Sequence, residues 1–261
     1  MSYESILFSL DRGIARLTLN RPDKLNSFNT QMHAEVRQAL GALGAEARVL
    51  ILTGAGRGFC AGQDLADRAV APGAQGIDLG DSIERNYKPL VLALQNLPMP
   101  VIAAVNGVAA GAGANIALAC DLVIAARSAS FVQAFSKLGL VPDSGGTWTL
   151  PRLVGNARAL GLTLLGQKLT AEQAAAWGMI WQCVDDAELG PTVDALAEQL
   201  AIAPTRGLAA TKAAIRGGWQ CTLAAQLDVE RDAQRELGRS ADYAEGVAAF
   251  SQKRTPNFTG R

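Results

Sequence analysis

Alternating hydrophobic and polar positions open the chain. Residues 5–10 and 14–19 both alternate and are separated by a three-residue turn, so the pattern predicts a β-hairpin. Apolar residues at a spacing of three and four then predict an amphipathic helix over 30–43, with Thr30 as its N-cap. Residues 49–52 are wholly apolar, which is typical of a strand buried between helices.

Helices and strands continue to alternate through the middle of the chain. After a long loop over 54–80 with a weak helical signal around 64–69, the pattern predicts helix 82–97, strand 101–105, helix 111–120 and strand 122–125. This order predicts an α/β fold whose sheet is joined by right-handed crossovers. From Gly145 onward the pattern is helical, with one strand at 179–184 and helices at 147–153, 156–165, 171–177, 188–202, 205–217, 221–237 and 240–250.

The stretch over 89–120 carries no charge and is longer than the roughly 20 residues that span a bilayer. It is nevertheless interrupted by Pro98, Pro100 and Asn106, whose polar or helix-breaking character lipid would not tolerate. The first residues also lack the basic and apolar regions of a signal peptide. We therefore expect short buried elements and no membrane partner.

Composition narrows the possible chemistry. The chain has 261 residues, with 24 Lys and Arg against 24 Asp and Glu. With no net positive charge, it has no overall electrostatic attraction for nucleic acid. Four widely spaced cysteines suggest neither a zinc site nor a disulfide framework, and a reducing cytoplasm is the expected location. The single histidine, His33, excludes most triads and multi-histidine metal sites. A catalyst here must use carboxylates, backbone dipoles or a cofactor.

Glycine-rich turns follow two of the predicted strands. Neither turn completes a dinucleotide fingerprint, because Phe59 and Ile116 stand where glycine is required. Glycine after a strand can instead bring backbone N–H groups close to a ligand, as in an oxyanion hole. The candidates are 59–65 and 107–115; in the second, small residues are equally compatible with close packing of a helix on a sheet.

Several motifs in a fixed order make the sequence resemble the crotonase family, the enoyl-CoA hydratases and isomerases, over nearly its whole length. They are NRP at 20–22, LN at 25–26, FCAGQDL at 59–65, PVIAAVNG at 100–107, GAG at 111–113, CD at 120–121 and GLVPD at 139–143 followed by GGT at 145–147. The resemblance implies an α/β fold built as a spiral of ββα units with a helical C-terminal part. It divides the chain into a core over 1–200 and a helical trimerisation region over 201–261.

The resemblance also implies a site for an acyl-CoA thioester. By position, the backbone donors that hold the thioester oxygen fall on Gln63 and Ala112. Other family positions around the substrate fall on Ala61, Asp64, Leu65, Gly111, Asn115 and Phe135. Phe250 and Lys253 fall where family members reach the coenzyme A of a neighbouring subunit, although a solvated charge cluster explains them equally well. The expected partners are the thioester and two or five further copies of the chain, as a trimer or a dimer of trimers.

The acid/base group separates members of the family from one another. The two glutamates of the hydratases fall here on Asn115 and Phe135, so hydration is disfavoured. Asp143 stands where some isomerases carry an aspartate, and the resemblance favours it as the catalytic group. From the residues alone, Asp143 before Ser-Gly-Gly could equally be a turn residue or the N-cap of the next helix.

Further segments resemble the branch of the family that converts an aromatic-ring epoxide thioester to its oxepin. They are 54–64, 134–140, 177–182 and 238–243. The resemblance thus implies an isomerase that acts on coenzyme A thioesters without a further cofactor or metal. A 3,2-enoyl-CoA isomerase is the alternative substrate class, and a catalytically silent CoA-binding scaffold is the alternative of another kind.

Overall fold

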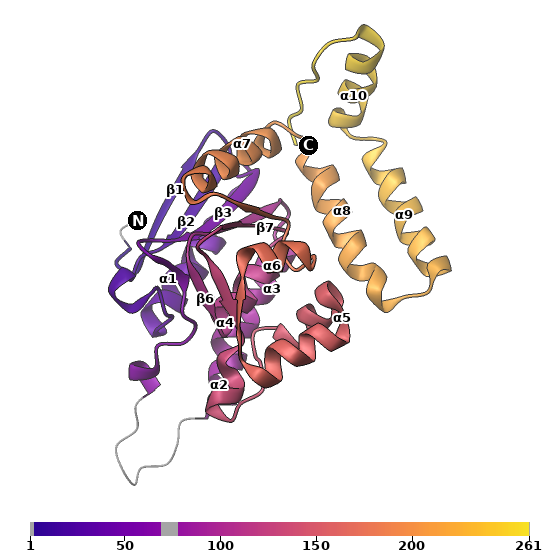
Figure 1. Cartoon of the computed structure of the whole chain (residues 1–261). Coiled ribbons are helices and arrows are strands. Elements are labelled where there is room, and N and C mark those ends of the chain that lie inside the picture. Colours follow the sequence, from indigo (N-terminus) through magenta and orange to yellow (C-terminus); the bar gives the residue numbers. More distant parts are fainter. Residues whose placement is uncertain (1–2, 69–77, 261) are drawn as a thin grey trace.

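The computed structural model describes residues 3–68 and 78–260. Six strands form the larger sheet in the order β1-β2-β3-β5-β7-β10 (Figure 1). Their bounds are β1 Ile6–Asp11, β2 Ile14–Leu19, β3 Val49–Gly54, β5 Val101–Val105, β7 Leu122–Ala126 and β10 Gln182–Val184. Strands β1 and β2 form the expected antiparallel hairpin, and every later neighbour in this sheet is parallel.

A second sheet of four short strands lies beside the first, in the order β4-β6-β8-β9. Its strands are β4 Gly58–Cys60, β6 Val108–Ala110, β8 Ser130–Val132 and β9 Lys168–Thr170. The pairs β3-β4, β5-β6 and β7-β8 each give one strand to each sheet before the chain continues into helical structure. This repetition is the spiral of ββα units that the resemblance implied.

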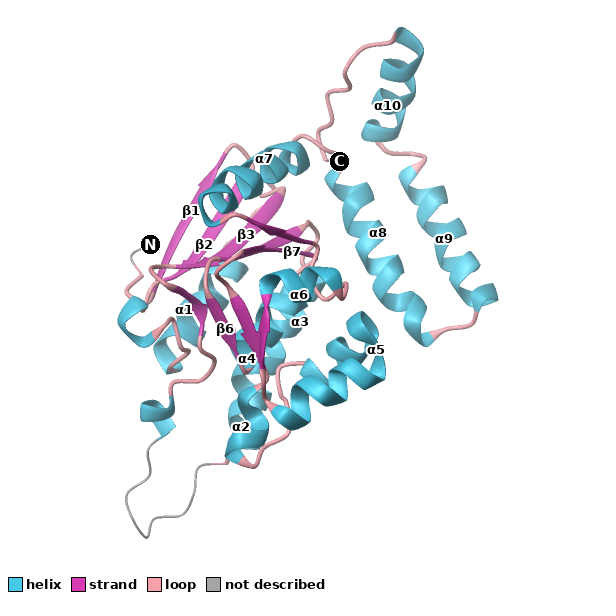
Figure 2. Ribbon diagram, viewed as in Figure 1, coloured by secondary structure: helices cyan, strands magenta, loops and turns pink. Residues whose placement is uncertain are grey.

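The helices cover these sheets and extend beyond them (Figure 2). Their bounds are α1 Thr30–Gly41, α2 Leu79–Ser82, α3 Lys88–Asn96, α4 Ala112–Ala119, α5 Gly146–Leu165, α6 Ala171–Ala176, α7 Leu189–Ala201, α8 Thr205–Gly217, α9 Leu223–Leu237 and α10 Ala241–Gln252. Helix α7 packs on strands β2, β3, β5 and β7 of the larger sheet.

Several predicted boundaries were wrong. The N-cap of α1 is Asn29, whose side chain accepts the N–H of Met32, and Thr30 is the first helical residue. The single helix predicted over 82–97 is α2, a π-helical turn over Ile83–Tyr87, and α3. The loop predicted over 54–80 contains strand β4 and a 3-10 turn at Leu65–Arg68, and its residues 69–77 lie outside the described part. Strand 179–184 shortens to β10.

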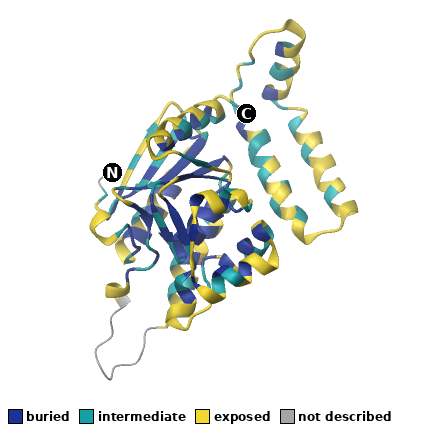
Figure 3. Ribbon diagram, viewed as in Figure 1, coloured by how far each residue is buried: buried dark blue, intermediate teal, exposed yellow. Residues whose placement is uncertain are grey.

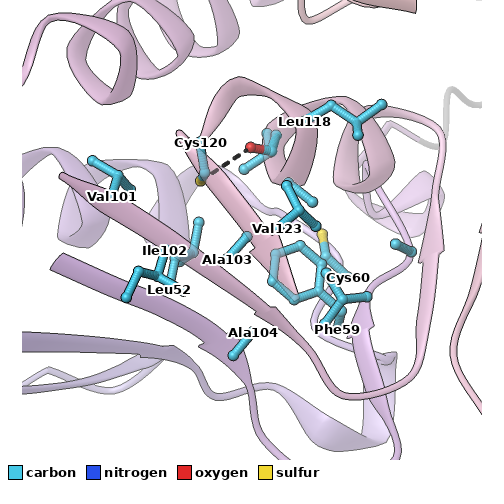
Figure 4. Close-up of a cluster of buried hydrophobic side chains, with 14 of the residues drawn as sticks. Leu52, Phe59, Cys60, Val101, Ile102, Ala103, Ala104, Leu118, Cys120 and Val123 are labelled. Atoms are coloured by element: carbon cyan, nitrogen blue, oxygen red, sulfur yellow. Dashed lines mark hydrogen bonds between the residues drawn. The ribbon is translucent and has the colours of Figure 1, made fainter. Parts of the chain in front are cut away.

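The core fills the space between the two sheets and their helices (Figure 3). Every residue of β5 is buried, as is every residue of α4, because both are packed on all sides. Figure 4 shows Phe59, Cys60 and Val123 packed among the side chains of β5. Burying a large apolar side chain contributes about 2 kcal/mol, so this interior fixes the strand ends from which the candidate site is built.

The C-terminal helices project from the body of the molecule (Figure 1). Helix α8 is tied to the core by Asp121, which forms ion pairs with Lys212 and Arg216, each at 2.8 Å. Helix α9 has no buried residue, and its Leu223 is 76% exposed. The division into a core over 1–200 and a trimerisation region over 201–261 stays a prediction.

Candidate functional site

The first candidate donor lies in the turn after β4. Phe28 donates its N–H to Gly62 O at 2.7 Å and accepts the N–H of Asp64 at 2.8 Å, as in a parallel bridge. In such a bridge the peptide groups flanking Gln63 face the partner strand, so the N–H of Gln63 itself points to the opposite side. The local backbone therefore leaves this N–H directed away from Phe28.

The second candidate donor lies at the start of α4. Gly111 has φ of +53° and donates its N–H to Val132 O at 2.8 Å, which fixes the entry to the helix. Ala112 is the first residue of α4, and a first helical N–H has no acceptor within its own helix. It also lies at the positive end of the helix dipole.

Close backbone approach brings the two donor segments together. A Cβ built on Gly62 would lie 3.4 Å from the N atom of Ala112 and only 2.9 Å from the oxygen of Ala110. A Cβ on Gly113 would lie 2.2 Å from the oxygen of Cys60. The glycines are thus needed for the contact between the β4 turn and the start of α4, which is a packing requirement and also the arrangement an oxyanion hole needs.

Asp64 is held by an ion pair beside the first donor. Arg21 donates from Nη2 to Asp64 Oδ2 at 2.8 Å and from Nη1 to Ser27 O at 2.6 Å, and Ala66 N donates to Asp64 Oδ1 at 3.1 Å. Burial opposes ionisation of Asp64, but these hydrogen bonds and the nearby cationic charges outweigh it and lower the pKa of the carboxyl. Asp64 caps the 3-10 turn that follows, so it supports the loop.

Asp143 lies in a turn before α5 and is half-buried. Its Oδ1 accepts the hydroxyl hydrogen of Ser144 at 2.9 Å. Its backbone oxygen accepts two hydrogen bonds, from Gly146 N at 2.9 Å and from Asn115 Nδ2 at 2.8 Å. The N-cap of α5 is Gly145, so the structure does not support the simple interpretation of Asp143 as a cap.

Asn115 connects α4 to the turn of Asp143. Its side chain is buried, donates to the Asp143 backbone and accepts from Gln133 Nε2 at 2.9 Å. Phe135 is also buried, and its ring lies 3.6 Å from where a Cβ on Gly111 would stand. The structure therefore brings Asn115 and Phe135 together with the start of α4 and, through Asn115, with Asp143.

The side chain of Gln63 joins a buried aromatic cluster. Tyr87 donates its hydroxyl hydrogen to Gln63 Oε1 at 2.9 Å, and the ring of His33 meets Tyr87 edge-on with centroids 4.5 Å apart. Neither Tyr87 nor Gln133 was among the predicted site residues. Each lies outside the recognised motifs, and a single polar atom on a buried side chain leaves no periodic signal in the sequence.

The other predicted residues differ in position: Ala61 and Leu65 flank the first donor in sequence, whereas Phe250 and Lys253 lie at the end of α10. Leu65 is 60% exposed, and Ala61 donates its N–H to Leu25 O at 2.9 Å. Phe250 is 88% exposed near the end of α10, followed by the exposed Lys253, on the far side of the projecting helices from α4 (Figure 1). A single chain does not bring Phe250 and Lys253 to the donors.

Among the residues that the structure describes, no three His, Cys, Asp or Glu side chains are grouped as metal ligands. None of the helices in this part of the chain is long and apolar enough to cross a membrane. A groove of about 400 Å³ lies between α5 and α8 and is lined by Trp148, Arg152, Lys212 and Trp219. The groove runs along the junction of α8 with the core. None of the residues that line it is a predicted site residue.

Comparison with known proteins identifies the class. Residues 9–261 match the family described as enoyl-CoA hydratase/isomerase. The chain belongs to this family, the crotonases, as its motifs had indicated. Among curated relatives, it is 60% identical over 260 residues to the 1,2-epoxyphenylacetyl-CoA isomerase of Escherichia coli (strain K12), covering 99% of each chain.

Two further relatives show how widely the fold extends. A protein named probable enoyl-CoA hydratase, from Rhodobacter capsulatus, is 50% identical over the whole of both chains. The crystal structure of an enoyl-CoA hydratase from Bacillus anthracis superposes with a TM-score of 0.91 at 34% identity, covering 99% of this chain and 100% of that one. The predicted α/β, crotonase-type fold is thereby confirmed.

Proposed function

We propose that this protein is an acyl-CoA isomerase. The observation that carries the proposal is the approach of the Gln63 turn to the N-terminus of α4, with Asp143 connected to the same helix through Asn115. Family membership and 60% identity to a protein named as an isomerase support the same class of reaction.

The backbone N–H groups of Gln63 and Ala112 would hold the thioester oxygen. Each such donor stabilises a developing enolate by roughly 3 to 4 kcal/mol in a water-poor site. The carboxylate of Asp143 then removes a proton from the α- or γ-carbon of the acyl chain and returns it to another carbon. Substrate and product have the same atoms, so the step needs no added water, oxidant or cofactor.

Hydration is not proposed, although two of the relatives carry hydratase names. Asn115 and Phe135 occupy the two positions at which the hydratases of the family carry glutamates, and neither side chain can act as a base at neutral pH. The one carboxylate at Asp143 suffices for proton transfer within a single substrate.

The substrate we propose is the ring-1,2-epoxide of phenylacetyl-CoA. The bond between its two epoxide carbons would break as the ring double bonds shift, which gives the seven-membered ring of oxepin-CoA with no atoms gained or lost. High identity over the full length to the Escherichia coli enzyme supports this choice. A 3,2-enoyl-CoA isomerase is the alternative, since the same enolate and the same carboxylate serve a double-bond shift. The alternative outside the enzymes is a protein that binds CoA as a scaffold and has no catalytic activity.

The assembly we propose is a homotrimer or a dimer of trimers in the cytoplasm, with the region over 201–261 at its interface. The exposed apolar side chains of the projecting helices support an interface there, among them Leu223, Tyr243 and Phe250. In such an assembly Phe250 and Lys253 would contact the coenzyme A of a neighbouring subunit.

The test is to supply purified protein with the ring-epoxide thioester and with a 3-enoyl-CoA, and to assay Asp143→Asn in parallel. We expect turnover of the epoxide by the wild type and a loss of about 100-fold or more in kcat for the variant. Inactivity of the wild type on both substrates would refute the enzyme, and an unimpaired variant would refute the role of Asp143.

A further inference from the structure

Two hydrogen bonds converge on the peptide carbonyl of Asp143. Its carbonyl oxygen has two lone pairs, and both are used, by Gly146 N and by Asn115 Nδ2. The next two residues, Ser144 and Gly145, have φ of +51° and +82°. A non-glycine residue at positive φ is costly, so this turn persists only where its surroundings hold it.

The amide of Asn115 can hold the turn in only one orientation. A carbonyl oxygen accepts but cannot donate, so the atom facing Asp143 O must be the nitrogen of Asn115. That leaves Asn115 Oδ1 facing Gln133 Nε2 at 2.9 Å, a donor, and fixes the orientation of Gln133 in turn. Both side chains are more than nine-tenths buried, so water does not compete freely for these bonds.

Backbone shape confirms how closely the amide is held. A Cβ on Gly146 would lie 2.4 Å from Asn115 Nδ2, so only glycine at this position lets the amide reach the turn. Gln133 follows strand β8 directly, and Asn115 lies in the first turn of α4, whose N-terminal residue is Ala112. This chain of contacts therefore fixes the turn of Asp143 relative to α4, the same helix that carries a proposed oxyanion donor.

We infer that Asn115 and Gln133 are positioning residues for Asp143. This amide pair sets the distance between the Asp143 carboxylate and the oxyanion donors, a role that rests on the proposed function. Neither residue transfers a proton. Their effect on catalysis is geometric, and a displacement of about 1 Å in a reacting group costs on the order of 100-fold in rate.

Asn115→Asp tests the inference with almost no change in shape. An ionised carboxylate cannot donate, so at pH 8 its oxygen would repel Asp143 O and displace the turn. A protonated carboxyl donates again, so the defect should shrink as the pH falls towards 5. We expect kcat to fall about 100-fold at pH 8 with KM changed less than about threefold, and the ratio of variant to wild-type kcat to rise at lower pH.

Gln133→Glu provides an independent second variant. A carboxylate facing Asn115 Oδ1 favours a flip of the Asn115 amide, which would turn its oxygen towards Asp143 O and give the same pH-reversible loss. Gln226→Glu is the matched control, because the Gln226 amide also donates to a backbone carbonyl, Ala214 O at 3.1 Å, but lies on α9. We expect its kcat to match the wild type.

Hydrogen exchange separates this inference from the proposed reaction. In Asn115→Asp at pH 8, amide exchange of 141–147 should be about tenfold faster than in the wild type under conditions where both remain folded. Wild-type kcat in both amide variants, or unchanged exchange in this segment, would overturn the inference. If the wild type turns over neither thioester, the proposed function fails, while the exchange comparison still decides whether the amides hold the turn.

Discussion

The Cα of Gly62 faces the backbone nitrogen of Ala112 so closely that a Cβ on Gly62 would stand 3.4 Å from that nitrogen. Gly62 has φ of +91°, in the region that side chains avoid. The contact joins the end of one sheet to the start of α4, and a side chain on Gly62 would also meet the oxygen of Ala110 at 2.9 Å.

Gly62→Ala should therefore lower kcat by more than its loss of folding stability can explain. The added methyl group would push against Ala110 O, 2.9 Å away, and separate the two N–H groups. We expect kcat to fall about 100-fold, as on loss of one oxyanion donor, with a loss of about 2 kcal/mol in the free energy of unfolding. Steady-state kinetics and urea unfolding measure the two effects.

Gly178→Ala is the control for backbone strain. Gly178 also has positive φ, at +73°, but a Cβ there would meet nothing nearer than Leu153 O at 4.0 Å. This variant should lose stability and keep its kcat. If Gly62→Ala retains full kcat, the contact with Ala112 has only a packing role.

The long elements of this fold could be predicted because their patterns repeat over several residues. Strand β5 and helix α7 appear close to their predicted bounds, and the expected break between 147–153 and 156–165 is present inside α5 at Gly155, with φ of +76°. By contrast, β4, β6, β8 and β9 have three residues each, too few for alternation to distinguish a strand from a turn.

The sequence marks candidate site residues only where family motifs stand. Gln63, Ala112 and Asp143 stand in such motifs, whereas Gln133 follows a three-residue strand and its contact with Asn115 is set by how β8 packs beside α4. The spacing of residues in the sequence does not predict this contact between Gln133 and Asn115. The orientation of the Asn115 amide likewise depends on partners distant in sequence.

Acid should weaken the loop of Asp64 in a defined pH range. The pKa of Asp64 is lowered in the folded state, so its ionised form stabilises the protein above the ordinary carboxyl pKa of about 3.9. That contribution is lost as the pH falls through the lower, folded-state value. Asp64→Asn should thus be about 2 kcal/mol less stable than the wild type at pH 7, with the difference disappearing in acid.

Urea unfolding at a series of pH values from 7 to about 3 would measure this convergence. Arg21→Gln is the matched partner variant, because it removes the guanidinium that donates to Asp64 at 2.8 Å. It should flatten the same part of the pH profile. A constant difference between Asp64→Asn and the wild type over the whole range would contradict the assignment.

Asp121→Asn should loosen helix α8 from the core. The carboxylate is mostly buried and forms ion pairs with Lys212 and Arg216, so the substitution leaves two partly buried cations without their counter-charge. Burial already lowers the pKa of Lys212, and Asp121 offsets part of that effect. We expect a loss of about 3 kcal/mol in the free energy of unfolding, measured by urea titration.

Asp232→Asn is the control for that prediction. Asp232 pairs with Arg231 at 2.9 Å, but both side chains are more than half exposed, so the same substitution should change stability little. Proteolysis adds a local measurement, since a loosened α8 should be cut earlier than the core. Equal stability of Asp121→Asn and the wild type would show that apolar packing alone holds α8.

The four thiols should differ sharply in reactivity. Cys60 and Cys120 are buried among the strands (Figure 4), where burial raises the pKa of Cys60 to about 12 and the pKa of Cys120 further still. The thiolate, the reactive form, is therefore disfavoured in both side chains at pH 8. Cys183 is half-buried with a raised pKa, whereas Cys221 is exposed.

A chromogenic thiol reagent at pH 8 should therefore label Cys221 first in the native protein, and all four cysteines only in denaturant. Cys221→Ser should remove the fast phase and leave the rest of the time course unchanged. Fast labelling of Cys60 in the folded protein would mean that β4 opens readily. Because Cys60 O lies against Gly113, such opening would also separate the β4 turn from the helix that carries Ala112.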